Sequence, residues 1–391
     1  MLRDKKILLG VTGGIAAYKA VELASNLTKA GAAVKVIMTD SAREFVSPLT
    51  FRSITGQSVT IRLFNSEAPI EHISLAEWCD LLVVAPATAN IIGKIASGIA
   101  DDLLSTTIMA CTSPVLVVPA MNSNMWDNPI VQENLNHICR NDYLIMPPDM
   151  GRLACGYEGK GRFPEVTEIA SWIRSALYYP RNMKGKKVLI TAGACREHLD
   201  PMRYISNESS GKMGLALARA AYHRGADVTL VAGHITEKVP YFLKSLSVSS
   251  AKDMYDATLR YANEMDIIIM TAAVTDFRFR EQSTKKLKKE KLDSASLKLD
   301  LQPTVDILKE LGQLKGEKQK LIGFAAETED MLANARKKLE AKNCDLIIAN
   351  DISNAGKNET EVVVIDREKE TDIRGDKFLV AHRILEMIVN Q

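Results

Sequence analysis

The run ILLGVTGG, residues 7–14, opens the chain with a short apolar stretch and a glycine turn. A segment with helical spacing follows over residues 15–30, Gly31 ends it, and the apolar run VKVIM at residues 34–38 comes next. Parallel neighbouring strands need a crossover of this length, usually a helix, to return the chain to the same end of the sheet. The start of the chain therefore predicts a strand, a helix and a second, parallel strand.

The same order of elements returns in the second half of the chain. Its parts are an apolar run, a glycine turn, a long loop, a helical stretch and a further apolar run: KVLI (187–190), TAG (191–193), 194–211, 212–224 and VTLV (228–231). Strands that alternate with helices of this length are typical of parallel sheets with helices on both faces. We therefore predict two doubly wound, Rossmann-like α/β domains.

The boundary between the two domains is predicted near residue 185. The segment Tyr178–Lys187 is short and polar and contains Pro180 and Gly185, as linkers often do. A chain of 391 residues is also long for a single core. We assign residues 1–183 to the first domain and residues 184–391 to the second.

Composition and charge exclude several classes of protein. The chain is 46% hydrophobic and 25% charged, with a formal net charge of +2. No apolar run reaches the roughly 20 residues that span a bilayer, and the near balance of charge argues against a nucleic-acid or anionic-membrane partner. The six cysteines show neither CxxC nor zinc-ligand spacing. We expect a cytoplasmic protein without a signal peptide, a disulfide framework or a zinc site.

Ligands of such sheets bind beyond the carboxyl ends of the strands. Apolar runs without alternation, typical of buried parallel strands, end at residues 85, 118, 270 and 349. The loops after these runs and the first glycine turn should hold the functional residues. Gly13-Gly14 would let backbone amides approach a phosphate. The GxGxxG fingerprint is absent and no acidic residue ends the second strand, which favours a mononucleotide over a dinucleotide.

Four strings in the first half together resemble the flavin-containing cysteine decarboxylases: GGIAAYK (13–19), APATAN (85–90), PAMNSNM (119–125) and ACGYEGKGR (154–162). The resemblance covers residues 1–175. It implies a flavodoxin-like flavoprotein fold with FMN in a cleft between the subunits of a trimer. The FMN-binding residues that it implies are Gly14, Thr39, Ala87, Thr88, Ser105 and Thr106.

The chemistry of this family explains the remaining residues. Loss of CO2 from a cysteine carboxylate leaves a carbanion that the substrate cannot delocalise, and flavin oxidation of the CH2–SH group to a thioaldehyde supplies the electron sink. The resemblance implies that His72 is the base, that Asn122 holds the carboxylate and that Cys155 protonates the enethiolate product. Cys155 lies in a glycine-rich stretch, 151–161, which we predict to be a mobile loop suited to a lid.

The string TAGACREHLDPMRYISNESSGKMG, residues 191–214, closely resembles the phosphopantothenoylcysteine synthetase family, as do later strings in the second half. Cys195, Met202 and Val305 depart from the family's usual Thr, Val and Pro. The Cys195 departure removes a hydroxyl that could contact the loop or the nucleotide.

This second resemblance implies a ligase that activates the carboxylate of 4'-phosphopantothenate with CTP and joins it to cysteine. Mg2+, or Mn2+, would accompany CTP, and the metal ligands stay unknown. Asn207 is implied at the acyl-phosphate centre, Arg203 at phosphopantothenate and Lys286 at the triphosphate. The remaining implied CTP-binding residues are Ala272, Asp276, Val305, Asp306, Ile307, Leu308, Phe324, Lys338 and Lys342. Together the two resemblances imply a homo-oligomer of decarboxylase trimers and ligase dimers, a dodecamer.

Three other interpretations stay open at this stage. Two Rossmann domains could form a nicotinamide-dependent dehydrogenase, although both halves lack its glycine fingerprint. Some relatives of the decarboxylases are regulators, but those tend to lose the catalytic His or Cys. The basic run Lys285–Lys291 could be a solvated loop or a nucleic-acid tail, but no aromatic residues interleave with it.

Overall fold

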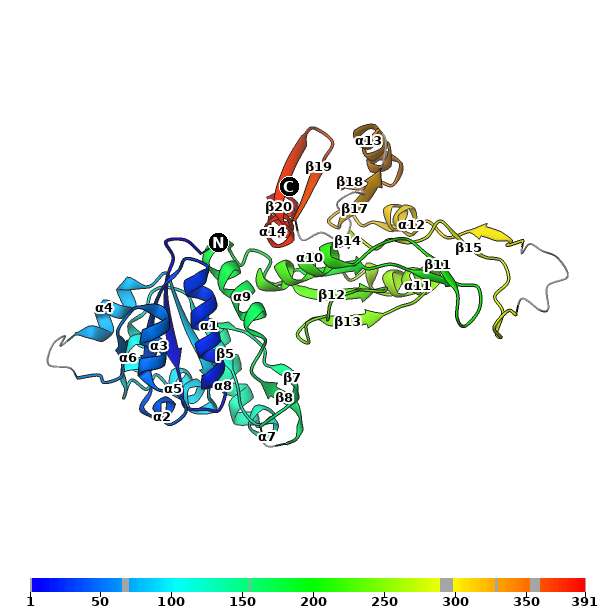
Figure 1. Cartoon of the computed structure of the whole chain (residues 1–391). Helices are drawn as coiled ribbons and strands as arrows, with labels where there is room; N and C mark the ends of the chain where they lie inside the picture. Colours follow the sequence, from blue (N-terminus) through cyan, green and yellow to red (C-terminus); the bar gives the residue numbers. More distant parts are fainter. Residues whose placement is uncertain are drawn as a thin grey trace. The chain divides into compact units, whose positions relative to one another are not determined.

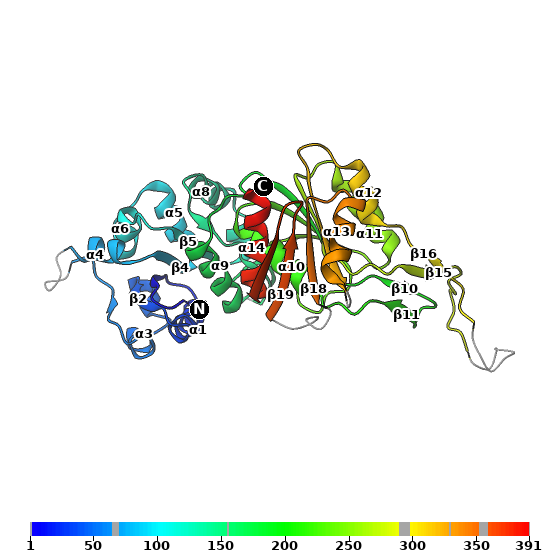
Figure 2. The same ribbon diagram turned by 90° about the horizontal axis from the view of Figure 1, so that it is seen from above.

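The computed structural model describes residues 2–64, 70–154, 156–288, 298–327, 330–351 and 359–390. The chain divides into two compact units, residues 1–180 and 181–391 (Figure 1). Each unit is a sheet with helices packed on both faces (Figure 2). The predicted fold class, two doubly wound α/β domains, is therefore confirmed.

The sheet of the first unit is parallel throughout. Its strand order is β3-β2-β1-β4-β5-β6. The strands are β1 (Lys6–Val11), β2 (Ala33–Met38), β3 (Val59–Thr60), β4 (Leu81–Ala87), β5 (Val115–Pro119) and β6 (Leu144–Ile145). The chain builds outward from β1 in one direction and then from β4 in the other, so the order reverses between these two strands. Such a reversal opens a crevice at the carboxyl ends of the strands.

Helices bury both faces of this sheet. They are α1 (Ala17–Lys29), α2 (Asp40–Arg43), α3 (Pro48–Thr55), α4 (Glu71–Trp78), α5 (Ala89–Ser97), α6 (Leu103–Ala110), α7 (Ser123–Trp126), α8 (Pro129–Arg140) and α9 (Val166–Tyr178). Apolar residues of α4, α5, α6 and α8 form one core with alternate residues of the strands, such as Leu82 and Val84. Helices α1 and α9 contact each other and β4 but contribute nothing to that core, so they cover the opposite face.

The sheet of the second unit is parallel from β13 to β18 and antiparallel beyond. Its order is β13-β12-β9-β14-β17-β18-β19-β20. The strands are β9 (Lys187–Ala192), β12 (Asp227–Ala232), β13 (Lys244–Ser247), β14 (Ile267–Met270), β17 (Lys320–Glu327), β18 (Leu346–Asp351), β19 (Glu359–Ile365) and β20 (Glu370–Asp376). The antiparallel pair at the edge was not predicted, because no strand was identified in the sequence after residue 349.

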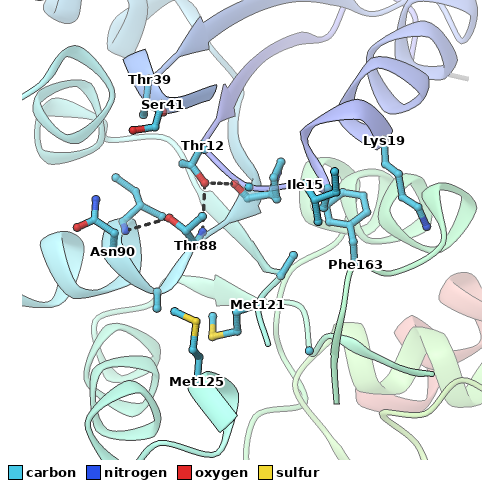
Figure 3. A pocket seen from close by; sticks show the side chains of 18 of the residues that line it. Thr12, Ile15, Lys19, Thr39, Ser41, Thr88, Asn90, Met121, Met125 and Phe163 are labelled. Carbon is cyan, nitrogen blue, oxygen red and sulfur yellow. Dashed lines mark hydrogen bonds between the residues drawn. The ribbon is translucent and has the colours of Figure 1, made fainter. Parts of the chain in front are cut away.

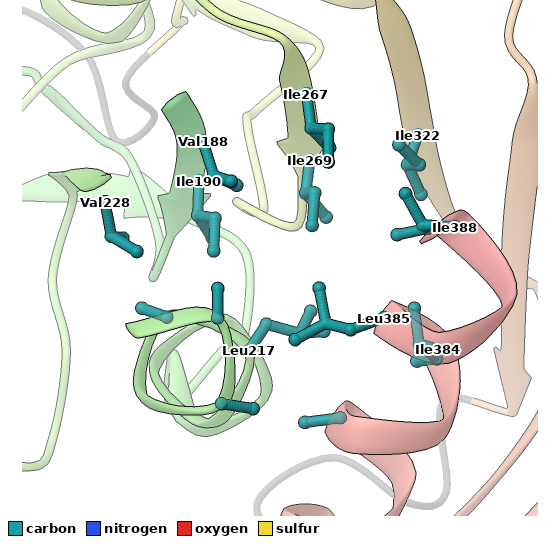
Figure 4. Packing of buried hydrophobic residues seen from close by; sticks show 14 of the residues in the cluster. Val188, Ile190, Leu217, Val228, Ile267, Ile269, Ile322, Ile384, Leu385 and Ile388 are labelled. Atoms are coloured by element: carbon teal, nitrogen blue, oxygen red, sulfur yellow. The ribbon is translucent and has the colours of Figure 1, made fainter. Parts of the chain in front are cut away.

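Two separate cores flank this sheet. The helices are α10 (Lys212–His223), α11 (Ala251–Ala262), α12 (Ile307–Leu314), α13 (Met331–Ala341) and α14 (Lys377–Asn390). Helices α10 and α14 lie side by side and face the strand residues Ile190 and Ile269 through Leu217 and Leu385 (Figure 4). Residues of α11, α12 and α13 pack on the other face, where Leu189 and Ile268 point. Successive strand residues thus point into different cores, as the alternation of a strand requires.

Short antiparallel ribbons extend from the ends of the parallel strands. They are β7 (Asp149–Arg152) with β8 (Glu158–Arg162), β10 (Arg196–His198) with β11 (Tyr204–Ser206), and β15 (Phe277–Phe279) with β16 (Leu301–Pro303). The first two correct the sequence analysis, which predicted loops in both places. The first ribbon was not predicted because it is rich in glycine, which is rare inside strands.

Close packing of helix α10 generates a stability prediction. A Cβ added to Gly214 would lie 2.4 Å from the Oγ1 atom of Thr271 and 2.5 Å from the Cβ atom of Ala192. We expect Gly214→Ala to destabilise the chain by about 1 kcal/mol or more, because overpacking outweighs the gain in helix propensity. Gly93→Ala in α5 is the matched control, since within the described part of the chain its Cβ would meet only Asn134, at 3.7 Å.

Calorimetry of the full chain should show a lower unfolding temperature for Gly214→Ala and an equal or higher one for Gly93→Ala. Equal stabilisation by both substitutions would contradict the close approach of α10 to the sheet.

Candidate active sites

A cavity of about 1260 Å³ lies at the carboxyl ends of the strands of the first unit. Its walls come from the segments after β1, β2, β4 and β5, and from the β7–β8 ribbon: residues 12–16, 39–41, 86, 88–91, 120–122 and 152–154, with others. The cavity therefore occupies the crevice between β1 and β4 that the strand order predicts. Figure 3 shows Thr12, Thr88 and Met121 converging on it from three of these segments.

A buried threonine connects the two central loops of this site. The Thr12 hydroxyl donates to the Pro86 carbonyl oxygen at 2.7 Å and accepts from the Thr88 backbone amide at 3.2 Å. The Thr88 hydroxyl in turn accepts from the Ile91 amide at 3.5 Å and caps helix α5. These bonds hold the glycine turn after β1 in register with the loop after β4 (Figure 3).

The lining of the cavity suits a phosphorylated ligand such as a flavin mononucleotide. A Cβ at Gly13 would lie 2.4 Å from the Cβ atom of Ser41, so only glycine lets these two loops approach. The Thr39 hydroxyl is buried and has no hydrogen-bond partner among the described residues. A buried, unpaired hydroxyl beside a cavity is an available group for a ligand's polar atom.

Only some of the predicted flavin-binding residues line the cavity. Gly14, Thr39 and Thr88 line it, whereas the Ala87 side chain is buried and its carbonyl accepts from the Ala120 amide at 3.0 Å. Ser105 and Thr106 are not among the residues that line it. Their hydroxyls donate within the first turn of α6, to the Asp102 carbonyl oxygen, at 3.1 and 2.7 Å.

Asn122 lies at the cavity, at the beginning of helix α7. Its Oδ1 atom accepts from the Asn124 amide at 2.8 Å, as a helix cap does. The Asn122 side chain therefore caps α7, and it is also the side chain predicted to bind the substrate carboxylate.

The β7–β8 ribbon packs tightly beside Asn122. The Met121 amide donates to the Gly161 carbonyl oxygen at 2.9 Å, and a Cβ at Gly161 would lie 2.2 Å from the Met121 carbonyl oxygen. A Cβ at Gly159 would meet the Ser123 hydroxyl at 2.3 Å. These two glycines permit close contact between ribbon and loop, where the sequence analysis expected them to provide mobility.

The other two predicted catalytic residues lie elsewhere. His72 is in the first turn of α4 and is not among the residues that line the cavity. Its Nδ1 atom is buried without a hydrogen-bond partner among the described residues. Cys155 lies outside the described residues, although its neighbour Ala154 lines the cavity.

Lys94, which sequence reasoning missed, adds a positive charge to the wall of the cavity. Its ammonium group lies 2.6 Å from the Asp101 carboxylate and 2.7 Å from the Asp102 carboxylate. Burial favours the neutral amine, but the two carboxylates outweigh it, so the pKa of Lys94 is raised. No sequence signal marked this lysine, because a single lysine inside a helix is ordinarily solvated.

The second unit repeats the connection between its central strands. The Ala272 amide donates to the Thr191 hydroxyl at 3.1 Å, which ties the loop after β14 to the end of β9. The Asn207 amide nitrogen donates to the Val274 carbonyl oxygen at 3.0 Å. Predicted residues Asn207 and Ala272 are therefore held at the same loop, and Asp276 follows it on the chain.

Four further predicted nucleotide-binding residues form a second group. The Lys342 ammonium group pairs with the Asp306 carboxylate at the beginning of α12, and Lys338 donates to the Phe324 carbonyl oxygen at 2.8 Å. Burial acts to raise the pKa of Asp306, but the hydrogen bond and charge of Lys342 outweigh it and hold that pKa below its usual value. The neighbouring side chains differ: Val305 is exposed, and Ile307 and Leu308 are buried in the core.

The two remaining predicted residues lie on adjacent segments. The Arg203 guanidinium donates to the Leu287 carbonyl oxygen at 2.6 Å, and Lys286 beside it is exposed. Lys289 and Lys291 of the basic run lie outside the described residues. Cys195 is fully buried in the core, where burial raises the pKa of its thiol to about 12. Its side chain therefore packs within the apolar core of the second unit.

Comparison with known proteins supports the family resemblance of each half of the chain. The family model described as DNA/pantothenate metabolism flavoprotein C-terminal domain matches residues 183–391, and the model described as flavoprotein matches residues 1–178. The coenzyme A biosynthesis bifunctional protein CoaBC of Bacillus subtilis (strain 168) is 48% identical over 373 residues, which cover 93% of this chain and 91% of the relative. The chain belongs to the family of bifunctional coenzyme A biosynthesis proteins.

A second relative and one solved structure are also similar to the chain. The family member of Vibrio cholerae serotype O1 is 44% identical over 357 residues, which cover 91% of this chain and 89% of the relative. The crystal structure of the C-terminal domain of a protein with the same name is 38% identical, with a TM-score of 0.46, and covers 54% of this chain and 97% of that domain.

Membership of the family makes the chain an enzyme of coenzyme A biosynthesis with decarboxylase and ligase activities, and its first unit a flavoprotein domain. The dehydrogenase and regulator interpretations are therefore wrong. Within the part of the chain that the structure describes, no helix is long and apolar enough to cross a membrane. The described residues also include no group of three His, Cys, Asp or Glu side chains that could hold a metal ion.

The tight contact at Gly161 predicts how this site can be disrupted. Gly161→Ala should push the β7–β8 ribbon away from Met121, so we expect weaker flavin binding and loss of most decarboxylase activity. Gly98→Ala is the control, since Gly98 also has a positive φ, of 69°, but among the described residues no atom beyond its own chain neighbours lies within 4 Å of its added Cβ. Flavin absorbance of the purified protein and CO2 release measure the two effects, and ligase activity should be unchanged in both variants. Equal flavin content and activity would contradict the predicted contact.

Proposed function

We propose that the first domain, residues 1–183, binds FMN in the cavity and decarboxylates 4'-phosphopantothenoylcysteine to 4'-phosphopantetheine. One observation carries this proposal: Gly14, Thr39, Thr88 and Asn122, from four distant segments, line a single cavity between β1 and β4. The unpaired Thr39 hydroxyl and the close approach of Gly13 to Ser41 suit the phosphate end of the flavin.

FMN would supply the two-electron oxidation of the substrate's CH2–SH group that allows CO2 to leave, and in its reduced form it would return the two electrons to the decarboxylated product. The chain's own residues then bind the substrate and move its protons. Asn122 would hold the departing carboxylate, His72 would accept the thiol proton, and Cys155 would protonate the enethiolate. His72 does not line the cavity of its own chain. This placement supports a homo-oligomer in which a neighbouring copy supplies His72, in line with the trimer that the family resemblance implies.

Substitutions of the two proton-transfer residues should fail at different stages. His72→Asn should prevent CO2 release, because the substrate thiol loses its base. Cys155→Ser should still release CO2 but stall afterwards, because a hydroxyl is a far weaker acid than a thiol. Mass spectrometry of the Cys155→Ser reaction should then find a product that lacks two hydrogens relative to phosphopantetheine. If both variants release CO2 at the wild-type rate and give the normal product, these roles are wrong.

We propose that the second domain, residues 184–391, is a CTP-dependent phosphopantothenate–cysteine ligase. The carboxylate of phosphopantothenate attacks the α-phosphorus of CTP and expels pyrophosphate, and the amine of cysteine then attacks the acyl carbon and expels CMP. Asn207 beside the β14 loop, and Lys338 and Lys342 beside Asp306, support this function with a neutral amide and two cations. Mg2+ or Mn2+ would accompany the triphosphate. The remaining residues assigned to CTP in the sequence analysis stay predictions, as do the cytoplasmic location and the dodecamer.

The two half-reactions can be separated by substitution. Lys286→Gln should lower pyrophosphate release by about 100-fold or more, since it removes a cation from the triphosphate as its charge develops. Asn207→Asp should slow the attack by cysteine more than the activation step, because a like charge lies beside the acyl-phosphate. The acyl-cytidylate should then accumulate and be detected by mass.

Lys285→Gln is the matched control, because it removes the same charge from the neighbouring position of the basic run. Its pyrophosphate release should stay close to wild type. Equal effects of Lys285→Gln and Lys286→Gln would indicate that the run is only a solvated basic surface.

A further inference from the structure

The buried Asp200 carboxylate holds two separate segments of the second unit together. Its side chain has no exposed surface, and its Oδ1 atom accepts from the backbone amides of Met202 at 2.7 Å and Arg203 at 2.9 Å. Its Oδ2 atom accepts from the Leu287 amide at 3.1 Å. The carboxylate therefore closes its own turn with one oxygen and reaches the base of the lysine run with the other.

Arg203 adds a contact to the other polar backbone group of Leu287. Its guanidinium donates to the Leu287 carbonyl oxygen and lies 3.7 Å from the Asp200 carboxylate. Nearby, the Ser283 amide donates to the Leu199 carbonyl oxygen at 2.9 Å. Both polar backbone groups of Leu287 are thus bound by the turn at residues 199–203, which belongs to a segment that is distant in the sequence.

A second aspartate shows which of the hydrogen bonds to Asp200 does not belong to an ordinary aspartate turn. Asp366, in the turn between β19 and β20, accepts with Oδ1 from the amides of Glu368 at 2.8 Å and Lys369 at 2.7 Å. This is the same pattern as at Asp200, whose donors are also the amides two and three residues ahead. The bond to Leu287 is therefore an addition to an ordinary aspartate turn.

We propose that Asp200 is a positioning residue that fixes Leu287, and through it Lys286, for the nucleotide-dependent step. This inference rests on the proposed role of Lys286. A lysine ammonium group on a flexible four-carbon stem gains precision when its backbone is fixed, since fewer conformations compete with the productive one. A buried acceptor that binds Leu287 from the turn supplies that constraint without touching the substrate.

Asp200→Asn tests the inference with little change of shape. The asparagine oxygen can still accept from Met202 and Arg203, but its NH2 group would then face the Leu287 amide, and two donors cannot bond. We expect kcat/KM for pyrophosphate release to fall by about 100-fold, with decarboxylase activity unchanged. Asp366→Asn, which alters the same kind of turn away from the lysine run, should leave both activities unchanged.

A double-mutant cycle with Lys286→Gln distinguishes positioning from general damage. If Asp200 acts through Lys286, then Asp200→Asn should cause almost no further loss in the Lys286→Gln background. Hydrogen exchange in the peptide that contains Leu287 should also become faster in Asp200→Asn and not in Asp366→Asn. This second measurement does not depend on activity.

Full additivity of the two losses, or unchanged exchange at Leu287, would overturn the inference while leaving the proposed role of Lys286 intact. Normal turnover by Lys286→Gln, with a large loss in Asp200→Asn, would overturn both the role of Lys286 and the positioning by Asp200. Normal turnover by Asp200→Asn would overturn the inference alone.

Discussion

In each unit, a buried threonine at the carboxyl end of the first central strand bonds across the point where the strand order reverses. Thr12 accepts from the Thr88 amide, and Thr191 accepts from the Ala272 amide. Two parallel strands that diverge here leave backbone groups that the sheet ladder no longer satisfies, and a threonine hydroxyl replaces the missing bond. At the opposite end of each pair, Asp80 and Asp266 accept from the first amides of β1 and β9, both at 2.8 Å. The central strands are thus secured at both ends, and the loops beyond them have fixed starting points.

The loops of the two units differ in the kinds of contact that they make. In the flavoprotein unit, glycines allow backbone segments to approach closely, and the β7–β8 ribbon closes on the loop after β5. In the second unit, the loops are longer, and charged side chains bond to backbone groups of other segments, as Arg203 of a loop and Lys338 of helix α13 do. The first arrangement suits a bound cofactor that performs the electron chemistry. The second suits the proposed triphosphate substrate, whose charge must be offset as a bond breaks.

Much of this was predictable, because strands and crossover helices produce strong local patterns. The run at residues 7–14 and its counterpart at residue 187 predicted both sheets, and motif resemblance placed Gly14, Thr39, Thr88 and Asn122, which line the cavity. The antiparallel β19 and β20 were missed, since buried strands were identified from unbroken apolar runs and charged residues interrupt that pattern in both edge strands. Lys94 and Asp200 were missed because their importance lies in partners that are remote in the sequence or in burial that composition does not show.

The sequence by itself determined that this chain has two doubly wound domains, that glycine turns and polar loops follow their strands, and which family it belongs to, because these are properties of residue order and spacing. Only the tertiary structure decided that the Ser105 and Thr106 hydroxyls are bonded within the first turn of α6, that Gly159 and Gly161 serve close packing, and that Arg203 binds Leu287. Each of these depends on which atoms meet after the chain has folded. Hydrogen bonds and steric contacts act over a few ångströms in space, so residue spacing along the chain cannot specify them.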